Sequence, residues 1–142
     1  MERAERAAVL AAEAERIVRA LVERGATLVV AFGSFGRGDV DPWSDLDILA
    51  VMESDLPFVE RLAELYEELA PRVGLDLLVY TPEEFERMKG RAFIRYALEE
   101  GRVLLRPDPR DEGRRWVEQA DRAIEGATEV LEAAVAAFRS DG

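Results

Sequence analysis

Two short apolar runs flank a glycine-dense turn early in the chain, and this arrangement constrains the fold more than any other feature. Thr27–Phe32 (TLVVAF) is aliphatic and β-branched, which predicts a buried strand. Gly33–Gly38 (GSFGRG) predicts a turn, and Pro42 soon follows, so no long regular element fits between them. Asp45–Val51 (DLDILAV) predicts a second strand that begins with charged residues. The sequence therefore indicates a strand–turn–strand unit with carboxylates at one end.

The flanking segments alternate between helical and strand patterns. A helix is expected over residues 2–24, a second over residues 56–70 with Asp55 as its N-terminal cap, and a third from the cap Thr81 to about Glu100. Strands are expected over residues 74–80 and, as a short edge strand, over residues 102–105. This order predicts an α/β (α+β) fold in which helices pack on a small mixed sheet.

Pro107-Asp108-Pro109 is the clear break in the chain and predicts the domain boundary. We expect one domain over residues 1–106 and an extension over residues 107–142. Apolar residues recur at three- and four-residue steps through the extension, which predicts a long amphipathic C-terminal helix. That helix could pack on the chain's own first helix, or it could offer an apolar face to a second copy, giving a homodimer, or to a helical partner.

The composition excludes several classes of function. Thirty acidic against nineteen basic residues give a net charge of −11, which disfavours non-specific binding to duplex nucleic acid. Cysteine and histidine are absent, so disulfides, thiol nucleophiles and imidazole catalysis are excluded. No apolar run is long enough for a membrane span and no signal peptide is evident, so a cytoplasmic protein is expected.

Three carboxylates are the candidates for metal binding. Asp45 and Asp47 are two residues apart on a predicted strand, so their side chains leave the same face and repel each other. A divalent cation such as Mg²⁺ would relieve that repulsion, because it prefers oxygen ligands. Asp76 is a third carboxylate, placed among aliphatic residues of another predicted strand, where burial without a partner would be costly.

Gly33 and Ser34 directly follow the first strand and could bind phosphate. Glycine lets the backbone approach an anion closely, and a serine hydroxyl can donate to it. The same pair could instead be an ordinary corner with Ser34 as a cap. Arg37 could also meet phosphate, although an ion-paired structural role fits it as well. The turn is not a Walker A loop, since the Gly-Lys-Ser/Thr ending is missing.

Together these residues resemble a known family. Gly33-Ser34 followed after ten residues by Asp45-Leu46-Asp47, with Asp76 on the next strand, is similar to the DNA polymerase β-type nucleotidyltransferase superfamily. The resemblance covers about residues 25–106. The short length is similar to that of the minimal nucleotidyltransferases, which pair with HEPN-domain proteins in toxin–antitoxin systems.

The resemblance implies a nucleotidyltransferase-like fold and a Mg²⁺-dependent enzyme that moves a nucleoside monophosphate, expected to be AMP from ATP, to a hydroxyl. Asp45 and Asp47 would hold two Mg²⁺ ions, and Asp76 would ligate the metal near the acceptor and help to deprotonate it. Gly33 and Ser34, with Arg37 nearby, would hold the nucleotide's phosphates.

Three functions remain open at this point. The first is an antitoxin that transfers AMP to a HEPN-type toxin. The second is transfer to a small molecule, as in the aminoglycoside nucleotidyltransferases. The third is a non-catalytic antitoxin that acts by binding its partner. The sequence does not distinguish the base of the nucleotide, the acceptor or the oligomeric state.

Overall fold

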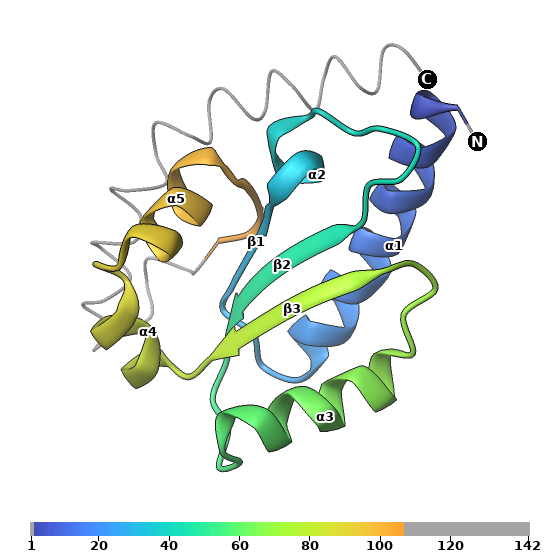
Figure 1. Cartoon of the computed structure of the whole chain (residues 1–142). Helices are drawn as coiled ribbons and strands as arrows, with labels where there is room; N and C mark the ends of the chain where they lie inside the picture. The colour runs from blue at the N-terminus through green and yellow to red at the C-terminus, as the bar shows by residue number, and fades with distance from the viewer. Residues whose placement is uncertain (1, 107–142) are drawn as a thin grey trace.

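The computed structural model describes residues 2–106, so the predicted extension over residues 107–142 and its helix lie outside the described residues. The described residues form nine helices and strands, and Figure 1 shows how they are arranged in space. They are α1 (Arg3–Glu23), β1 (Leu28–Phe32), α2 (Gly33–Arg37), β2 (Leu46–Val51), α3 (Phe58–Leu69), β3 (Leu75–Tyr80), α4 (Pro82–Met88), α5 (Ala92–Glu100) and β4 (Arg102–Leu105). None of the helices in this part of the chain is long and apolar enough to cross a membrane.

The four strands form one mixed sheet in the order β3-β2-β1-β4. β1 pairs antiparallel with both β2 and β4, whereas β2 and β3 run parallel. A parallel pair requires a crossover connection, and α3 supplies it between β2 and β3. Consequently the carboxyl end of β1 and the amino ends of β2 and β3 meet at one edge of the sheet.

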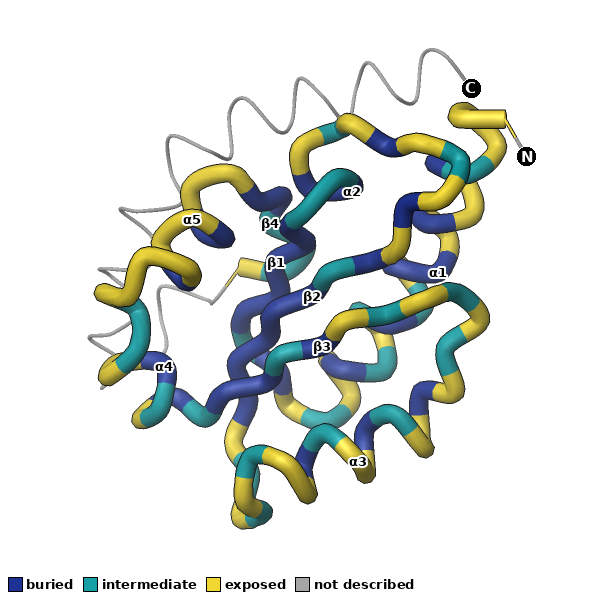
Figure 2. The backbone as a smooth tube through the Cα atoms, in the orientation of Figure 1, coloured by how far each residue is buried: buried dark blue, intermediate teal, exposed yellow. Residues whose placement is uncertain are grey.

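Helices cover both faces of the sheet, as Figure 1 shows, and make two apolar clusters. One cluster packs α1 and α3 against alternate residues of the strands, among them Val29 and Ile48. The other packs α4 and α5 against the opposite face, where Val30 and Leu49 lie. β1 is buried along its whole length, while the amino end of β3 is open to solvent (Figure 2). The predicted mixed sheet with packed helices is confirmed.

Two details of the predicted helices are wrong. Asp55 does not cap α3, because the helix begins later and Pro57 occupies the N-cap position without a side-chain bond. The helix expected from Thr81 to Glu100 is two helices, α4 and α5, separated at residues 89–91 around Gly90. Glycine is a poor helix former, and here it coincides with the change of direction.

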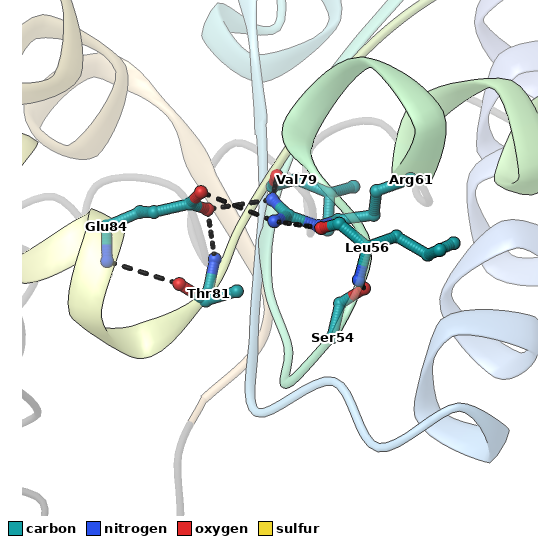
Figure 3. A network of polar contacts seen from close by, with 6 residues as sticks. All are labelled: Ser54, Leu56, Arg61, Val79, Thr81 and Glu84. Carbon is teal, nitrogen blue, oxygen red and sulfur yellow. Dashed lines mark hydrogen bonds and ion pairs between the residues drawn. The ribbon is translucent and has the colours of Figure 1, made fainter.

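Thr81 does cap α4, and its capping box joins a buried ion pair (Figure 3). Arg61 of α3 is only 4% exposed, and its guanidinium donates to both carboxylate oxygens of Glu84, at 2.7 and 3.3 Å. The same guanidinium donates to the carbonyl oxygens of Val79 and Leu56. Arg61 therefore connects α3, the end of β3 and α4.

Replacing Glu84 with Gln is expected to lower the free energy of unfolding by about 1–3 kcal/mol at neutral pH, because the buried Arg61 loses its charged partner. The hydrogen bond from Arg61 holds the pKa of Glu84 below its ordinary value of 4.5. This stabilisation is therefore complete above that value and is lost as the pH falls through the lowered pKa. Urea unfolding from pH 7 to pH 3 should show a weaker pH dependence for the variant. Glu86→Gln, on the same helix but half exposed, is the control, and an equal effect there would contradict the assignment.

Candidate active site

The sheet register brings the sequence-predicted residues to one edge. Phe32, the last residue of β1, pairs with Asp47 of β2, and Asp47 pairs with Asp76 of β3. Gly33 follows Phe32 directly, so the glycine–serine corner lies beside Asp47. Asp47 and Asp76 occupy the face of the sheet that α4 and α5 cover, because they alternate with residues of the other cluster.

Asp47 and Asp76 form a hydrogen-bonded pair of carboxyl groups. Burial, followed by the hydrogen bond and the negative charge of Asp76, raises the pKa of Asp47 to about 6. Asp45 adds a weaker repulsion, whereas the positive charge of Arg37 acts in the opposite direction. Two carboxyl groups this close share a proton or require a cation between them. Asp76 itself is exposed at the start of β3, so the expected cost of burying it does not arise.

Asp45 stands apart from that pair. Its side chain is 58% exposed, and its Oδ1 lies 3.3 Å from Nη2 of Arg6 in α1. A Cβ added to Gly74 would lie 2.5 Å from the carboxylate carbon, so Asp45 packs directly on the backbone before β3. Within residues 2–106 no group of three carboxylates is close enough to hold one metal ion. The structure thus brings together Asp47 and Asp76, but not all three.

The glycine–serine corner is built around Gly33. Gly33 has a φ of +65°, and a Cβ on it would overlap Oδ2 of Asp47. Only glycine therefore fits between β1 and this carboxylate. Ser34 is the second residue of the five-residue helix α2, and its Oγ lies 2.9 Å from Oγ of Ser44. Ser34 thereby ties the corner to the loop that leads into β2.

Arg37 lies at the end of α2 and is ion-paired, which is one of the two roles expected for it from the sequence. Its guanidinium donates to the Tyr96 hydroxyl at 3.0 Å and lies 3.6 Å from the Asp39 carboxylate. Its positive charge partly offsets the rise in the pKa of Asp47, so Arg37 is within electrostatic reach of the acidic pair. A phosphate bound there would compete with Asp39 for this guanidinium.

Sequence reasoning missed three supports of the site. Tyr66 of α3 donates to the Leu75 carbonyl oxygen at 2.8 Å and accepts from the Leu77 amide at 2.9 Å, so it fixes the backbone on both sides of Asp76. Arg102 of β4 places its guanidinium 4.4 Å from the ring centre of Phe35 in α2. Arg6 is the third. A tyrosine or arginine on a helix or a short strand carries no signal of such a contact, because the partners are distant in sequence.

The acidic pair suits a divalent cation. Asp47 has a raised pKa because burial and the neighbouring Asp76 disfavour its ionised form, and a bound cation would stabilise that form. Oxygen donors from Asp47 and Asp76, with Asp45 near enough to influence Asp47, match the preference of Mg²⁺ for a few carboxylates. The residues present therefore fit the metal that the resemblance implied.

A separate cavity of about 530 Å³ lies at the opposite end of β2, between α1 and α3. It is lined by Arg24, Arg61 and several acidic side chains. Both arginines are already ion-paired, Arg24 with Glu64 and Glu68 and Arg61 with Glu84. The Asp47–Asp76 pair is therefore a better candidate for the active site than this cavity.

Comparison with known proteins decides the family. A family model described as a nucleotidyltransferase domain matches residues 13–105. The chain belongs to this family. The matched segment begins within α1 and includes every strand of the sheet, so it contains the glycine–serine corner and all three aspartates. The resemblance to the DNA polymerase β-type nucleotidyltransferases is thereby confirmed, while the narrower likeness to the partners of HEPN proteins stays a prediction.

One relative of this nucleotidyltransferase has a more specific name. A protein of Methanocaldococcus jannaschii, named "Putative protein adenylyltransferase MJ0604", is 37% identical over 78 residues. The aligned segment covers 54% of this chain and 75% of that protein. The name concerns that protein.

Proposed function

We propose that this nucleotidyltransferase moves AMP from ATP to a hydroxyl group and requires Mg²⁺. The observation that carries the proposal is the Asp47–Asp76 pair, which lies against the glycine–serine corner. Burial and mutual repulsion disfavour the ionised form of Asp47, and a bound cation would stabilise it. Transfer of the adenylyl group, rather than another nucleotide, is supported by the name of the relative.

The chain's residues divide the work by position. Gly33 and Ser34 would bind the β- and γ-phosphates, because the left-handed Gly33 turns the chain at the corner and Ser34 presents a hydroxyl there. Asp47, Asp76 and Asp45 would hold two Mg²⁺ ions, which stabilise the attacking and leaving oxygens of an in-line displacement. Arg37 would add positive charge near the phosphates. These roles need neither histidine nor cysteine, and the chain has neither.

The proposed reaction forms one bond and breaks one. The acceptor oxygen bonds to the α-phosphorus, and the bond from that phosphorus to the bridging oxygen breaks, so pyrophosphate leaves with the electron pair. The hydroxyl proton would pass to a carboxylate of the Asp47–Asp76 pair. Asp76 is the more accessible of the two to an acceptor, because it is exposed.

A protein hydroxyl is the acceptor we favour. The relative is named for action on proteins, and an open site at a sheet edge can admit a side chain of another protein. In that setting we propose a HEPN-domain toxin as the partner and an antitoxin role for this chain. A small-molecule acceptor, as for the aminoglycoside nucleotidyltransferases, and inhibition by binding alone are the alternatives.

Labelled nucleotides test the reaction. With Mg²⁺ and a candidate protein acceptor, such as the product of a neighbouring gene, label from [α-³²P]ATP should appear on the acceptor, and label from [γ-³²P]ATP should appear in pyrophosphate. Transfer from the γ-position would indicate a kinase and contradict the proposal. Label on a small hydroxylated compound, with none on protein, would favour the small-molecule alternative. Inhibition of the partner without any label would favour binding alone.

A further inference from the structure

Arg6 of α1 holds the segment that leads into β2. Its Nε donates to the Ser44 carbonyl oxygen at 2.8 Å, and its Nη2 lies 3.3 Å from Oδ1 of Asp45. The Arg6 side chain is only 16% exposed, whereas that of Asp45 is 58% exposed. The guanidinium is therefore enclosed between helix and loop, while the carboxylate stays accessible to a ligand from solvent.

Ser44 links this contact to the glycine–serine corner. It is 7% exposed, and its Oγ lies 2.9 Å from Oγ of Ser34 and accepts from the Asp41 amide at 2.9 Å. The Arg6 bond to the Ser44 carbonyl therefore fixes a loop whose buried residue Ser44 already contacts the corner. The second Arg6 contact is ionic, longer and partly exposed, so it is the weaker of the two.

The ionic contact occupies a carboxylate that a cation would need. Asp45 already acts on Asp47 by repulsion, and Arg37 is the one cation among the described groups that shift the pKa of Asp47. In the described part of the chain Asp45 pairs with Arg6 instead of completing a trio with Asp47 and Asp76. A guanidinium and a metal ion cannot both take the same oxygen in the same direction.

We propose that Arg6 is a positioning residue that serves as the internal counter-ion of Asp45 and gives up this carboxylate when a divalent cation binds. The Nε bond to Ser44 keeps the loop in place during the exchange. The inference rests on the proposed function, because it assumes that Asp45 is a metal ligand. It adds that metal affinity is set partly by competition from Arg6.

Titration of the full chain with Mn²⁺ alone, without nucleotide, tests the proposed role of Arg6. The concentration of free Mn²⁺ is measured by its electron paramagnetic resonance signal. Arg6→Gln removes the charge but keeps an amide donor for the Ser44 carbonyl. It should bind Mn²⁺ about two- to fivefold more tightly than the unmodified protein, the range for losing a partly exposed ion pair. Arg6→Lys keeps the charge and should restore the original affinity. Arg19→Gln removes a charge from an exposed pair on the same helix and should change nothing.

A double-mutant cycle with Asp45→Asn separates competition from a general charge effect. The gain from Arg6→Gln should disappear when Asp45 is already neutral, because there is no carboxylate to release. An unchanged or weaker affinity of Arg6→Gln, or an equal gain in the Asp45→Asn background, would overturn the role of Arg6 and leave the proposed function standing. Absence of Mn²⁺ binding by the unmodified chain would count against both.

Discussion

Asp47→Asn should reduce nucleotidyl transfer by at least about a thousandfold, the effect of losing several kcal/mol of metal-borne stabilisation in the transition state. Asp47 lies at the centre of the site. It pairs with Phe32 and Asp76 in the sheet, and Gly33 packs on its Oδ2. Asparagine has nearly the same shape but cannot balance a divalent cation. The rate is measured as label transferred from [α-³²P]ATP in single turnovers with saturating Mg²⁺.

Asp55→Asn is the matched control, because it removes the same charge from an exposed position at the other end of β2. Its rate should stay within about twofold of the unmodified protein, as is usual for a surface substitution away from the site. If Asp47→Asn retained more than a tenth of the activity, the acidic pair would not be the centre of the reaction.

Asp47→Asn should also stabilise the metal-free fold. Because burial and Asp76 raise the pKa of Asp47 to about 6, the ionised carboxylate is disfavoured in the folded state. The penalty is absent below the unfolded pKa of 3.8, grows as the pH rises through about 6, and is constant above that. Urea unfolding in EDTA at pH 8 should show Asp47→Asn more stable by about 1–2 kcal/mol, a value reduced for solvent screening, with the difference vanishing near pH 4. A destabilised variant at pH 8 would contradict this electrostatic account.

Gly33→Ala should have the second-largest effect, with transfer reduced by about a hundredfold or more, as when reacting groups shift by about 1 Å. The added methyl group would overlap Oδ2 of Asp47 and move this carboxylate away from the corner. The left-handed backbone at φ +65° adds about 1–2 kcal/mol of strain to any residue with a Cβ.

Gly25→Ala separates strain from displacement of the carboxylate. Gly25 also has a positive φ, of +93°, but a Cβ there would meet no atom within 4 Å. This variant should lose a similar amount of stability, measured by thermal unfolding, and keep its transfer rate. Equal losses of activity in the two variants would show that general destabilisation, not the position of Asp47, limits the reaction.

The fold could be predicted largely because its signals are local. The apolar runs of β1 and β2 and the Thr81 cap of α4 each depend on a few neighbouring residues, and the structure confirms them. The division between α4 and α5 was missed because an isolated glycine such as Gly90, although a poor helix former, is also found inside helices. Asp55 was a plausible cap by residue type, but Pro57 displaced the start of α3.

The site was less predictable, since its geometry depends on pairing between strands. Asp76 could be recognised as an unusual charge among aliphatic residues, but its contact with Asp47 follows only from the parallel register of β2 and β3. Asp45 pairs instead with Arg6, one of several arginines on a charged helix and 39 positions away. No spacing rule connects two such residues. The roles of Asp45, Asp47 and Asp76 in binding metal stay predictions until they are measured.

A crystal structure with Mn²⁺ and a non-hydrolysable ATP analogue is the most direct test of the whole account. Anomalous scattering should place manganese against the carboxylate oxygens of Asp47 and Asp76, with the triphosphate on the backbone of Gly33 and Ser34. Nucleotide bound instead in the cavity between α1 and α3, or manganese bound away from both aspartates, would contradict the account.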